Sequence, residues 1–435
     1  MEDSMAKGDR IAIIDGCRTP FLRSGTEYRE MMAYEICRHA VKGLIAKTGI
    51  PNDLVDHVIM GGVANDIATT NVAREIVLAA GLPYTIPAYT CTVACISANA
   101  AIISGANLIV NGNANCIVAG GVETFSDPDI KISRNYRRFI LDLTMFKRPK
   151  GIIGKLKLLK GMSLKDFVVP EKPAIGEFST KMRMGDTADR LAKRLGITKR
   201  QQDEFAALSH NRAAAAWEKG ILKKEVIPVV TPHGKLVEKD NGFRKGTTVE
   251  KLEQLKPAFD RRYGTVTAGN SSFLTDGGAA VLLMSETLAK KMGLKPLAYI
   301  KSYAFTAQDL WEELLLGPSF AIPKALAMGK LKFKDIGVWE IHEAFGAQMI
   351  GVIKTLASAS FCRDRLGLPG KLGEIPIDAL NVYGGSLSLG HPFGATGARL
   401  VTTCANRLRE TGKRYGVVAG CAAGAVGNAI ILERA

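Results

Sequence analysis

The chain has 435 residues, of which 47% are hydrophobic, and a formal net charge of +16 at pH 7. A chain of this length can bury sizeable cores, and we expect about two or three domains or one large duplicated unit. It has no apolar run of about 18 residues, the length that a membrane-spanning helix needs, which argues against an integral membrane protein.

The N-terminal residues are acidic and run directly into the first predicted strand, residues 10–16 with the sequence RIAIIDG. They lack the apolar core of a signal peptide and the Arg- and Ser-rich composition of a transit peptide, so we expect a cytoplasmic protein. Residues 54–63 show a second strand pattern, and residues 71–81 an amphipathic helix. Residues 91–124 then predict a helix of small residues and a strand that ends in Gly-Gly.

Residues 127–255 interrupt this alternation and are predicted to form an inserted loop domain. Within them, residues 131–165 hold eleven Lys and Arg residues and one acid, Asp142, so that this segment carries a formal charge of +10. Apolar residues interleave with its lysines, as in an interfacial amphipathic helix. A solvated loop whose apolar side chains pack on the parent domain is the alternative. A clear helix follows, with Thr198 as its N-cap and Gly220 just after its end.

The C-terminal part repeats the order of elements of the first part. Residues 296–305 predict a strand, and residues 334–357 a buried strand, a loop and a helix. Residues 384–424 predict a Gly-rich loop, a helix and a strand with a Gly-rich end, the order already found in residues 91–124. Alternating strands and helices indicate an α/β fold with buried parallel or mixed sheets, here in two similar halves. The predicted limits are residues 1–126, the insertion 127–255, the return of the first half 256–289, and the second half 290–435.

Four residues with reactive side chains lie in loops beside predicted strands. Cys95 stands at or just before a helix N-terminus, where unpaired N–H groups and the helix dipole favour a thiolate. His391 lies in GGSLSLGHPFGATG, whose five glycines allow the main chain to approach other groups closely. Cys421 and His342 each follow an apolar strand. Open α/β sheets place their sites at the carboxyl ends of parallel strands, so we expect the four residues to converge there.

Other interpretations of single residues are weaker than this constellation. Cys95 taken alone also fits a packed thiol, and His342 a core histidine. The chain has eight cysteines, none in a Cys-X-X-Cys pair, which argues against a zinc ribbon or a disulfide scaffold, and no metal site is predicted. The glycines around His391 have the spacing GxxxGxxG, and a P-loop motif is absent, so nucleotide binding is not indicated.

These motifs, in chain order, resemble the signature blocks of the thiolase family. The blocks are ACISAN, TVTAGNSSFLTDGGAA, HEAF, GGSLSLGHPFGATGARL and CAAGAVGNA, and the resemblance spans nearly the whole chain. HEAF, RMGDTADRLAKRLGIT and LLLGP look most like the β-subunits of fatty-acid-oxidation complexes. The resemblance implies an acyltransferase that cleaves 3-ketoacyl-CoA with CoA, giving acetyl-CoA and a shortened acyl-CoA in the last step of fatty acid β-oxidation.

The resemblance also implies a role for each of the four residues. Cys95 matches the nucleophile that takes the acyl group as a thioester, and His391 matches the base that activates it. Cys421 matches the second acid/base, which protonates the departing acetyl-CoA enolate and then deprotonates incoming CoA. His342 stands where many thiolases carry asparagine, and with His391 it would hold the substrate thioester oxygen through a water. Backbone N–H groups of Cys95 and of the residues just after Cys421 would form a second oxyanion site.

Two further residues are implied to contact substrate, and two depart from the family pattern. Ser272 matches a serine that contacts the pantetheine of CoA, and Phe345 is expected to line the pocket. Ala425 replaces the second glycine of the family's CAAGG, which matters if the backbone there needs a positive φ. Cys91 is expected to be inert, with a disulfide to the nucleophile as the alternative.

The resemblance implies CoA as a co-substrate and no tightly bound cofactor. It also implies a homodimer or tetramer, and an α-subunit partner with hydratase and dehydrogenase activities. For residues 131–165 we expect docking to a partner and to a membrane surface, with guidance of CoA esters as a further option. Few aromatic residues and no recognisable module in this segment argue against nucleic acid as a partner.

Three other activities are weighed against this interpretation. A biosynthetic acetoacetyl-CoA thiolase would carry the same family motifs. A decarboxylating ketoacyl synthase would share the fold and a cysteine nucleophile, but it would not need a second reactive cysteine such as Cys421. A non-catalytic lipid- or membrane-binding scaffold would have no need of the complete set, so the intact Cys95, His342, His391 and Cys421 argue against it.

Overall fold

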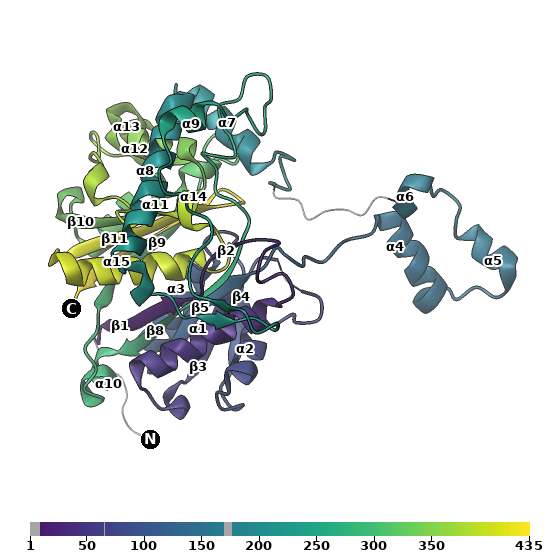
Figure 1. Cartoon of the computed structure of the whole chain (residues 1–435), viewed down its shortest axis with the longest axis horizontal. Helices are drawn as coiled ribbons and strands as arrows, with labels where there is room; N and C mark the ends of the chain where they lie inside the picture. The colour runs from purple at the N-terminus through teal and green to yellow at the C-terminus, as the bar shows by residue number, and fades with distance from the viewer. Residues whose placement is uncertain (1–8, 65, 169–175) are drawn as a thin grey trace. The chain divides into compact units, whose positions relative to one another are not determined.

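A computed structural model of the chain describes residues 9–64, 66–168 and 176–435. Contacts divide the chain into two compact units. The first comprises Met1–Asp127 and Gly176–Ala435, and the second Pro128–Ile175. We call them the main unit and the basic unit (Figure 1).

Within the described part of the main unit, ten strands form one sheet, in the order β10-β11-β12-β9-β1-β8-β5-β3-β4, with β2 paired to β8. Two short strands, β6 and β7, pair separately. The strand bounds are β1 (Ile11–Arg18), β2 (Leu22–Arg23), β3 (His57–Gly61), β4 (Ala88–Cys91), β5 (Cys116–Glu123), β6 (Val229–Val230), β7 (Leu236–Val237), β8 (Thr275–Ser285), β9 (Ala298–Ala307), β10 (Ile336–Ile341), β11 (Tyr415–Ala422) and β12 (Val426–Arg434).

The sheet consists of two halves with the same arrangement. β3 runs parallel to β5, and β10 runs parallel to β11. In each half two antiparallel strands follow, β8 and β1 in the first half and β12 and β9 in the second. β1 and β9 then pair with each other and join the halves. The predicted α/β fold of two similar halves is therefore confirmed, with a mixed sheet because β8 and β12 return against the direction of their neighbours.

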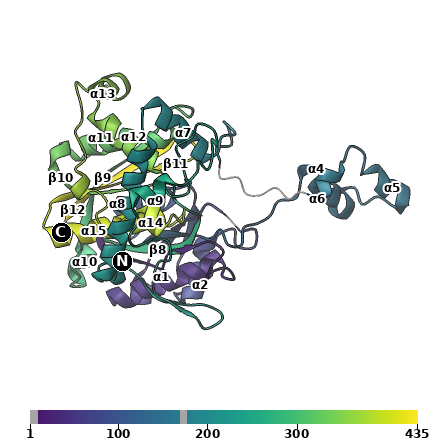
Figure 2. The same ribbon diagram turned by 45° about the horizontal axis from the view of Figure 1, so that its top comes forward.

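Helices bury both faces of this sheet. α3 packs on strands of the first half, α15 packs on strands of both halves, and the two helices contact each other. α1 and α2 lie together at one side of the main unit, and α11 and α12 lie toward the other (Figures 1 and 2). The helix bounds are α1 (Ala33–Thr48), α2 (Val72–Ala80), α3 (Ser97–Val110), α4 (Arg134–Leu141), α5 (Gly151–Lys157), α6 (Leu164–Val168), α7 (Met184–Arg194), α8 (Lys199–Glu218), α9 (Val249–Glu253), α10 (Glu286–Lys291), α11 (Gly317–Gly329), α12 (Gly346–Ala357), α13 (Ala359–Leu366), α14 (Ser386–Leu389) and α15 (Thr396–Thr411).

The helix predicted in the middle of the chain is α8, and its ends are where the sequence places them. Thr198 caps it by accepting a hydrogen bond from the backbone N–H of Gln201, whose side chain bonds back to Thr198. Gly220 follows the last turn with a φ of +69°, a conformation that glycine adopts without steric cost. α7 and α8 pack against α12, so this part of the expected insertion belongs to the main unit. The predicted domain limits themselves stay a prediction.

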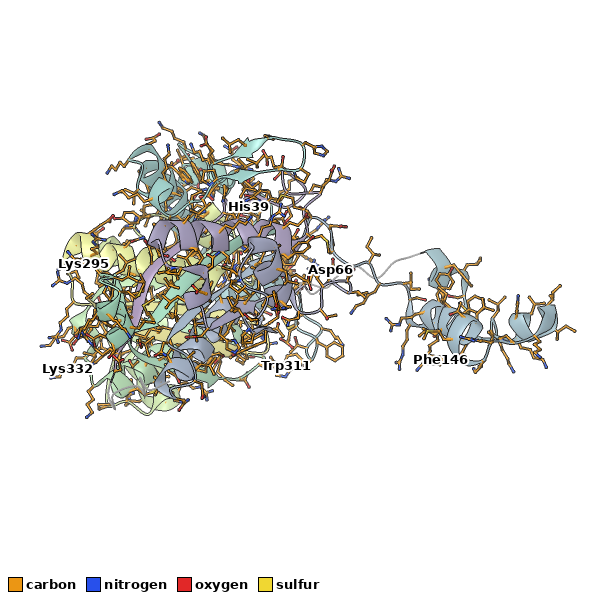
Figure 3. The ribbon with its side chains drawn as sticks, turned by 90° about the horizontal axis from the view of Figure 1, so that it is seen from below. His39, Asp66, Phe146, Lys295, Trp311 and Lys332 are labelled. Carbon is orange, nitrogen blue, oxygen red and sulfur yellow. The ribbon has the colours of Figure 1, made fainter. Side chains whose placement is uncertain are left out.

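The basic unit contains α4, α5, α6 and a π-helical turn at Asp142–Phe146. Its internal contacts include the ring of Tyr136 against Phe167 (centroids 4.9 Å apart) and a hydrogen bond from the hydroxyl of Ser133 to the carboxylate of Asp166. None of the side chains described between residues 128 and 167 is buried. Phe146, labelled in Figure 3, is 69% exposed. Over residues 128–167 this unit therefore has helices without an apolar core of its own.

Among the residues that the structure describes, no helix is long and apolar enough to cross a membrane. The exposed apolar residues of the basic unit lie instead on short helices and turns.

Candidate active site

Cys95 lies in the tight connection between β4 and α3. The preceding residue, Ala94, has a φ of +44°, an uncommon and strained conformation for a residue with a side chain. Ser97 stabilises the turn, because its hydroxyl accepts from the N–H of Val93 and donates to the carbonyl of Ala94. The structure thus places Cys95 just before a helix N-terminus, as the sequence predicts.

The two histidines come from the second half and lie side by side. His342 follows β10 directly, and His391 follows α14 in the Gly-rich loop. Their ring centroids are 3.9 Å apart, with 37° between the ring planes. The sulfur of Cys95 and one ring nitrogen of each histidine all lie within 4.8 Å of one another. Three of the four predicted residues are therefore brought together at one point.

The glycines of the loop allow His391 to reach this point. Gly390 has a φ of +104°, and a Cβ there would lie 2.5 Å from the hydroxyl oxygen of Thr275. That hydroxyl oxygen accepts a hydrogen bond from the backbone N–H of His391 (2.9 Å). A Cβ at Gly394 would lie 2.3 Å from the carbonyl oxygen of Val122, at the end of β5. The loop of the second half is therefore pressed against strands of the first half, which larger residues would prevent.

Cys421, the last of the four predicted residues, lies near the end of β11 and is buried. Burial raises the pKa of its thiol, and the neighbouring Cys95 raises it further. Two residues on, the backbone N–H of Ala423 donates a hydrogen bond to the sulfur of Cys95. The two cysteines, 326 positions apart in the chain, thus belong to the same site.

The thiol of Cys95 is neutral in the resting site. Burial raises its pKa to about 12, and the nearby Glu123 acts in the same direction, while the hydrogen bond from Ala423 opposes both. The sequence-based expectation of a thiolate favoured by the helix N-terminus is therefore wrong for the resting site, because the cost of desolvating the anion is larger than the helix contribution. A base must accept the proton before Cys95 can attack a substrate.

His391 is arranged to be that base. Its Nδ1 lies 2.6 Å from the hydroxyl oxygen of Thr396, and this hydroxyl donates its one proton to the carbonyl of Pro392 (3.0 Å). Nδ1 must therefore carry the hydrogen, which leaves an unprotonated Nε2. This Nε2 is buried and has no hydrogen-bond partner among the described residues. Burial, with smaller contributions from His342 and Arg399, holds the pKa of His391 well below its usual value, so the ring is neutral.

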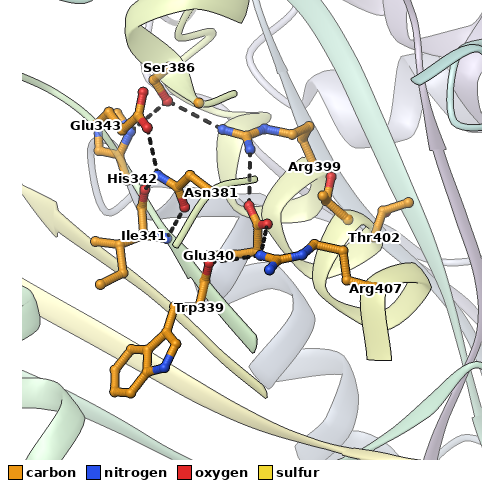
Figure 4. Close-up of polar contacts among 12 residues, drawn as sticks. Trp339, Glu340, Ile341, His342, Glu343, Asn381, Ser386, Arg399, Thr402 and Arg407 are labelled. Atoms are coloured by element: carbon orange, nitrogen blue, oxygen red, sulfur yellow. Dashed lines mark hydrogen bonds and ion pairs between the residues drawn. The ribbon is translucent and has the colours of Figure 1, made fainter. Parts of the chain in front are cut away.

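His342 has the opposite proton arrangement. Its Nδ1 lies 2.9 Å from the hydroxyl oxygen of Ser386, which also accepts a hydrogen bond from the guanidinium of Arg399 (3.4 Å; Figure 4). A guanidinium only donates, so the Ser386 proton is free to point at Nδ1, and the hydrogen of His342 lies on Nε2. Burial lowers the pKa of His342 to about 3, and Arg399 contributes to this shift. The ring is a neutral hydrogen-bond donor.

A buried ionic network supports the loop that carries His342. Arg407 donates to one carboxylate oxygen of Glu340 (2.7 Å), and Arg399 lies 3.7 Å from the other (Figure 4). Glu343 accepts hydrogen bonds from the side chain of Asn381 (2.7 Å) and the backbone N–H of Leu387. Each buried charge thus has a partner, as burial requires. The network fixes the main chain on both sides of His342.

Glu123 joins the two halves at the site. Its carboxylate accepts from the backbone N–H groups of Ala64 (2.8 Å) and Gly394 (3.0 Å), the latter in the loop of His391. Burial raises the pKa of Glu123 to about 7.

The sequence motifs contain Ser386, Thr396 and Arg399, but only the folded structure shows that they orient the histidines. The sequence offered one indication of this role: the three residues bring two hydroxyls and one arginine into the Gly-rich block that carries His391.

The residues expected to bind CoA lie beside the cluster. The backbone N–H of Ser272 donates to the carbonyl of Ala344, and Leu274, two residues on, forms a bridge with His391. Phe345 is buried, and its ring meets the ring of Phe259 edge-on (centroids 6.2 Å apart). Their contacts with substrate stay a prediction.

The two departures from the family pattern have structural answers. Ala425 has a φ of +54°, so this position does take the conformation that glycine adopts without strain, at a cost of about 1–2 kcal/mol for alanine. Cys91 is a free thiol that donates to the carbonyl of Ser97 (3.6 Å). Burial raises its pKa to about 11, which fits the expected inert role.

Comparison with known families gives matches along almost the entire chain. Residues 11–287 match the family described as Thiolase, N-terminal domain, and residues 294–434 match Thiolase, C-terminal domain. The chain is 46% identical over 423 residues to the trifunctional enzyme subunit beta, mitochondrial, of Bos taurus, covering 97% of this chain and 88% of that protein. It is 41% identical to a 3-ketoacyl-CoA thiolase of Yersinia enterocolitica, covering 98% and 97%.

Solved structures show the same likeness. The human mitochondrial 3-ketoacyl-CoA thiolase superposes with a TM-score of 0.82 at 28% identity, covering 99% of this chain and all of that one. The acetyl-CoA acetyltransferase of Bacillus anthracis gives a TM-score of 0.81 at 31% identity, covering 98% and 99%. Both similarities extend over the whole fold.

Proposed function

The chain belongs to the thiolase family, and from that premise we propose that it is a 3-ketoacyl-CoA thiolase, an acetyl-CoA C-acyltransferase of fatty acid β-oxidation. It cleaves 3-ketoacyl-CoA with CoA and releases acetyl-CoA and a shortened acyl-CoA. One observation supports this most strongly: a cysteine sulfur and two imidazole nitrogens from distant parts of the chain lie within 4.8 Å of one another. CoA acts as co-substrate, and no tightly bound cofactor takes part.

In the first half-reaction His391 and Cys95 act together. Nε2 of His391 takes the thiol proton of Cys95, and the thiolate attacks the 3-keto carbon of the substrate. The bond between C2 and C3 then breaks, which leaves the acyl group on Cys95 as a thioester and releases the enolate of acetyl-CoA. Cys421 donates its thiol proton to C2 of that enolate.

In the second half-reaction the protons return. The Cys421 thiolate takes the proton of incoming CoA, whose sulfur attacks the thioester on Cys95. Cys95 leaves as a thiolate and recovers its proton from His391, so both cysteines and the histidine end as they began. The raised thiol pKa values suit this cycle, because each thiol holds its proton until a partner needs it.

The negative charge that develops on the substrate needs hydrogen-bond donors. We propose that the Nε2–H of His342, together with the protonated His391, holds the thioester oxygen of the leaving acetyl-CoA through a water molecule. For the tetrahedral oxygen at Cys95, the donors are its own backbone N–H and the N–H groups after Cys421. The hydrogen bond from Ala423 to the Cys95 sulfur supports this second site.

An absorbance assay of 3-ketoacyl-CoA cleavage with short, medium and long acyl chains tests this function. We expect the wild-type protein to cleave these substrates only when CoA is present, and the Cys95→Ser variant to be inactive. Cys91→Ser is the matched control, since it changes the neighbouring thiol and should keep the wild-type rate. Cleavage by Cys95→Ser at the wild-type rate would refute the assignment.

We also propose that the chain works as a subunit of a larger assembly. The relatives named trifunctional enzyme subunit beta support an α-subunit partner that carries out the preceding hydration and dehydrogenation. Homodimers or tetramers of this chain would form its core. We further propose that this assembly works in the cytoplasm, at a membrane surface.

The basic unit is the segment proposed to dock on that surface. Ile152 and Ile153 are 77% and 74% exposed, and Lys155 and Lys157 follow on the same short helix. Exposed apolar residues beside lysines are suited to the boundary of an anionic bilayer. Co-sedimentation with anionic vesicles tests the proposal. We expect the wild type to sediment and an Ile152→Ser, Ile153→Ser variant to stay in solution; equal sedimentation would end the membrane hypothesis.

A further inference from the structure

We propose that Cys95, His342 and His391 also form a binding site for a soft divalent cation, with Zn²⁺ as the cation of choice, whose binding switches the enzyme off. The inference rests on the proposed function in one respect: the ligands are the groups that carry out the reaction. A bound cation therefore keeps the substrate carbonyl from reaching its position beside Cys95, His342 and His391. The site adds a mode of regulation to the reaction.

The donor atoms are of the types that zinc prefers. Thiolate sulfur and imidazole nitrogen bind Zn²⁺ at about 2.3 Å and about 2.0–2.1 Å, and open sites use three protein ligands with water in the fourth position. Ligand atoms around a tetrahedral Zn²⁺ lie about 3.3–3.6 Å apart, by these bond lengths. The three donor atoms here lie within 4.8 Å of one another. Small side-chain rotations, of about 1 Å at the donor atoms, close that difference.

One ring nitrogen of each histidine is free to bind a cation. Nε2 of His342 and Nε2 of His391 are both buried and have no hydrogen-bond partner among the residues that the structure describes. On the other side of each ring, Nδ1 is hydrogen-bonded to a hydroxyl: that of Ser386 for His342 and that of Thr396 for His391. Metal-binding histidines almost always have such a partner on the second nitrogen, because it fixes the orientation of the ring.

Binding requires one proton to leave the protein and one to move. The Cys95 thiol loses its proton to solvent and binds as a thiolate. Nε2 of His391 already offers a lone pair. His342 moves its hydrogen from Nε2 to Nδ1, while the Ser386 hydroxyl turns to accept it. The bound state thus contains a thiolate and two neutral imidazoles, with one proton released for each cation.

His342 is the residue that distinguishes this site. An asparagine at this position, as in the NEAF form of the motif, supplies an amide, which is a poor ligand for Zn²⁺ compared with imidazole. The substitution His342→Asn therefore removes one ligand and keeps a side chain that donates hydrogen bonds. It separates cation binding from the catalytic role of the nucleophile.

The test is a Zn²⁺ titration of the full-length reduced protein, followed by calorimetry with a competing chelator and by dialysis stoichiometry. We expect one Zn²⁺ per chain, the release of one proton, and inhibition of cleavage over the same Zn²⁺ concentrations. Co²⁺ in place of Zn²⁺ should give the absorption of a tetrahedral site with a thiolate ligand. Removing a direct ligand in His342→Asn should weaken affinity by at least about tenfold, judging from the 10–100-fold losses seen for outer-shell partners.

Cys91→Ser is the control for thiols outside the site and should bind Zn²⁺ as the wild type does. Equal affinity of wild type, His342→Asn and Cys95→Ser would overturn the proposal, and so would an active wild type that binds no Zn²⁺. These results leave the proposed function standing. Conversely, if the protein binds one Zn²⁺ through these residues but cleaves no 3-ketoacyl-CoA, the cation site is supported and the proposed function is refuted.

Discussion

The main unit and the basic unit differ in which side chains they bury and which they expose. In the main unit Arg18 and Asp240 are almost completely buried, and they form a two-pronged ion pair at 2.6 and 2.8 Å. In the basic unit it is the apolar side chains, such as Ile152 and Ile153, that face outward. The main unit thus contains charges that are buried as a pair, whereas the basic unit exposes apolar residues that a core would normally cover.

This difference shows which features of the sequence belong to the chemistry. The net charge of the chain is dominated by the basic unit, since residues 131–165 carry +10 of the +16. The candidate active site uses neutral thiols and neutral imidazoles, and the buried arginines near it are paired with carboxylates. The buried charges near the candidate active site therefore fix positions, whereas the exposed lysines of the basic unit are available to a partner. The experiments below test whether the two regions are independent.

Substituting His391 should give the largest effect. In His391→Gln the site loses its base and one donor to the thioester oxygen, and we expect kcat to fall by about 10⁴-fold. Vesicle co-sedimentation should be unchanged, since the basic unit keeps its composition. A variant that loses both cleavage and vesicle binding would contradict the independence of the two units.

Substituting Cys421 should slow one chemical step more than another. In Cys421→Ala the enolate of acetyl-CoA lacks its acid, so exchange of the acetyl α-proton with solvent should slow by about 10³-fold. Acylation of Cys95 by acyl-CoA should fall much less. Proton exchange measured by NMR in deuterated buffer checks this, and a normal exchange rate would remove Cys421 from its role.

The buried ion pair offers a matched stability test between the units. Asp240 also accepts hydrogen bonds from Trp217 and from the backbone of Phe21, so Asp240→Ala leaves Arg18 buried and unpaired. We expect a loss of about 3–5 kcal/mol in the free energy of unfolding. Asp142→Ala in the basic unit breaks the exposed pair with Lys147 and should cost less than about 1 kcal/mol. Similar losses in urea denaturation would contradict the comparison.

Acid should destabilise the main unit through His210. Burial, with contributions from Arg244 and Arg23, lowers its pKa to about 4, and its Nδ1 accepts a hydrogen bond from the N–H of Arg244. The unfolded chain takes up this proton near pH 6.5 and the folded chain does not, so stability falls as the pH drops. The loss from this group between pH 7 and pH 5 is about 2 kcal/mol.

The substitution His210→Gln isolates that contribution, because glutamine accepts a hydrogen bond without titrating. We expect the free energy of unfolding of this variant to fall less than that of the wild type between pH 7 and pH 5. Parallel curves for the two proteins would show that His210 is charged in the folded state or accessible to solvent.

The smallest effect on catalysis is expected from the basic unit. Lys155→Glu reverses one charge, and at about 1 kcal/mol per unit charge near an anionic surface it should weaken vesicle binding roughly tenfold or more. Cleavage of a short-chain substrate in solution should change by less than about twofold, since Lys155 has no role in the proposed reaction. Lys256→Glu, at an exposed lysine of the main unit, is the control and should bind vesicles as the wild type does.

The sequence was informative where a local pattern determines structure. The ends of α8 followed from Thr198 and Gly220, because capping depends on residues close in the chain. The convergence of Cys95, His342 and His391 followed from the repeat of strand-end loops, since a duplicated fold brings equivalent loops together.

The sequence could not show what long-range contacts decide. Arg18 and Asp240 are 222 positions apart, and nothing in either neighbourhood predicts that they pair. Likewise, the hydroxyls of Ser386 and Thr396 determine which ring nitrogen of each histidine carries the hydrogen. These hydrogen bonds depend on atomic positions to within a few tenths of an ångström, which the sequence does not give. The limits of the basic unit, Pro128–Ile175, were also not apparent, because the sequence placed this segment within one longer insertion, residues 127–255.

The most direct test of the central claim is the location of the acyl group on the protein. The wild type is incubated with acetyl-CoA, quenched with acid and digested, and fragment masses distinguish Cys95 from Cys91 and Cys116. The account predicts one acetyl group per chain, attached to Cys95 and released by added CoA. An acetyl group on a different cysteine, or continued cleavage of 3-ketoacyl-CoA without any acylated cysteine, would contradict it.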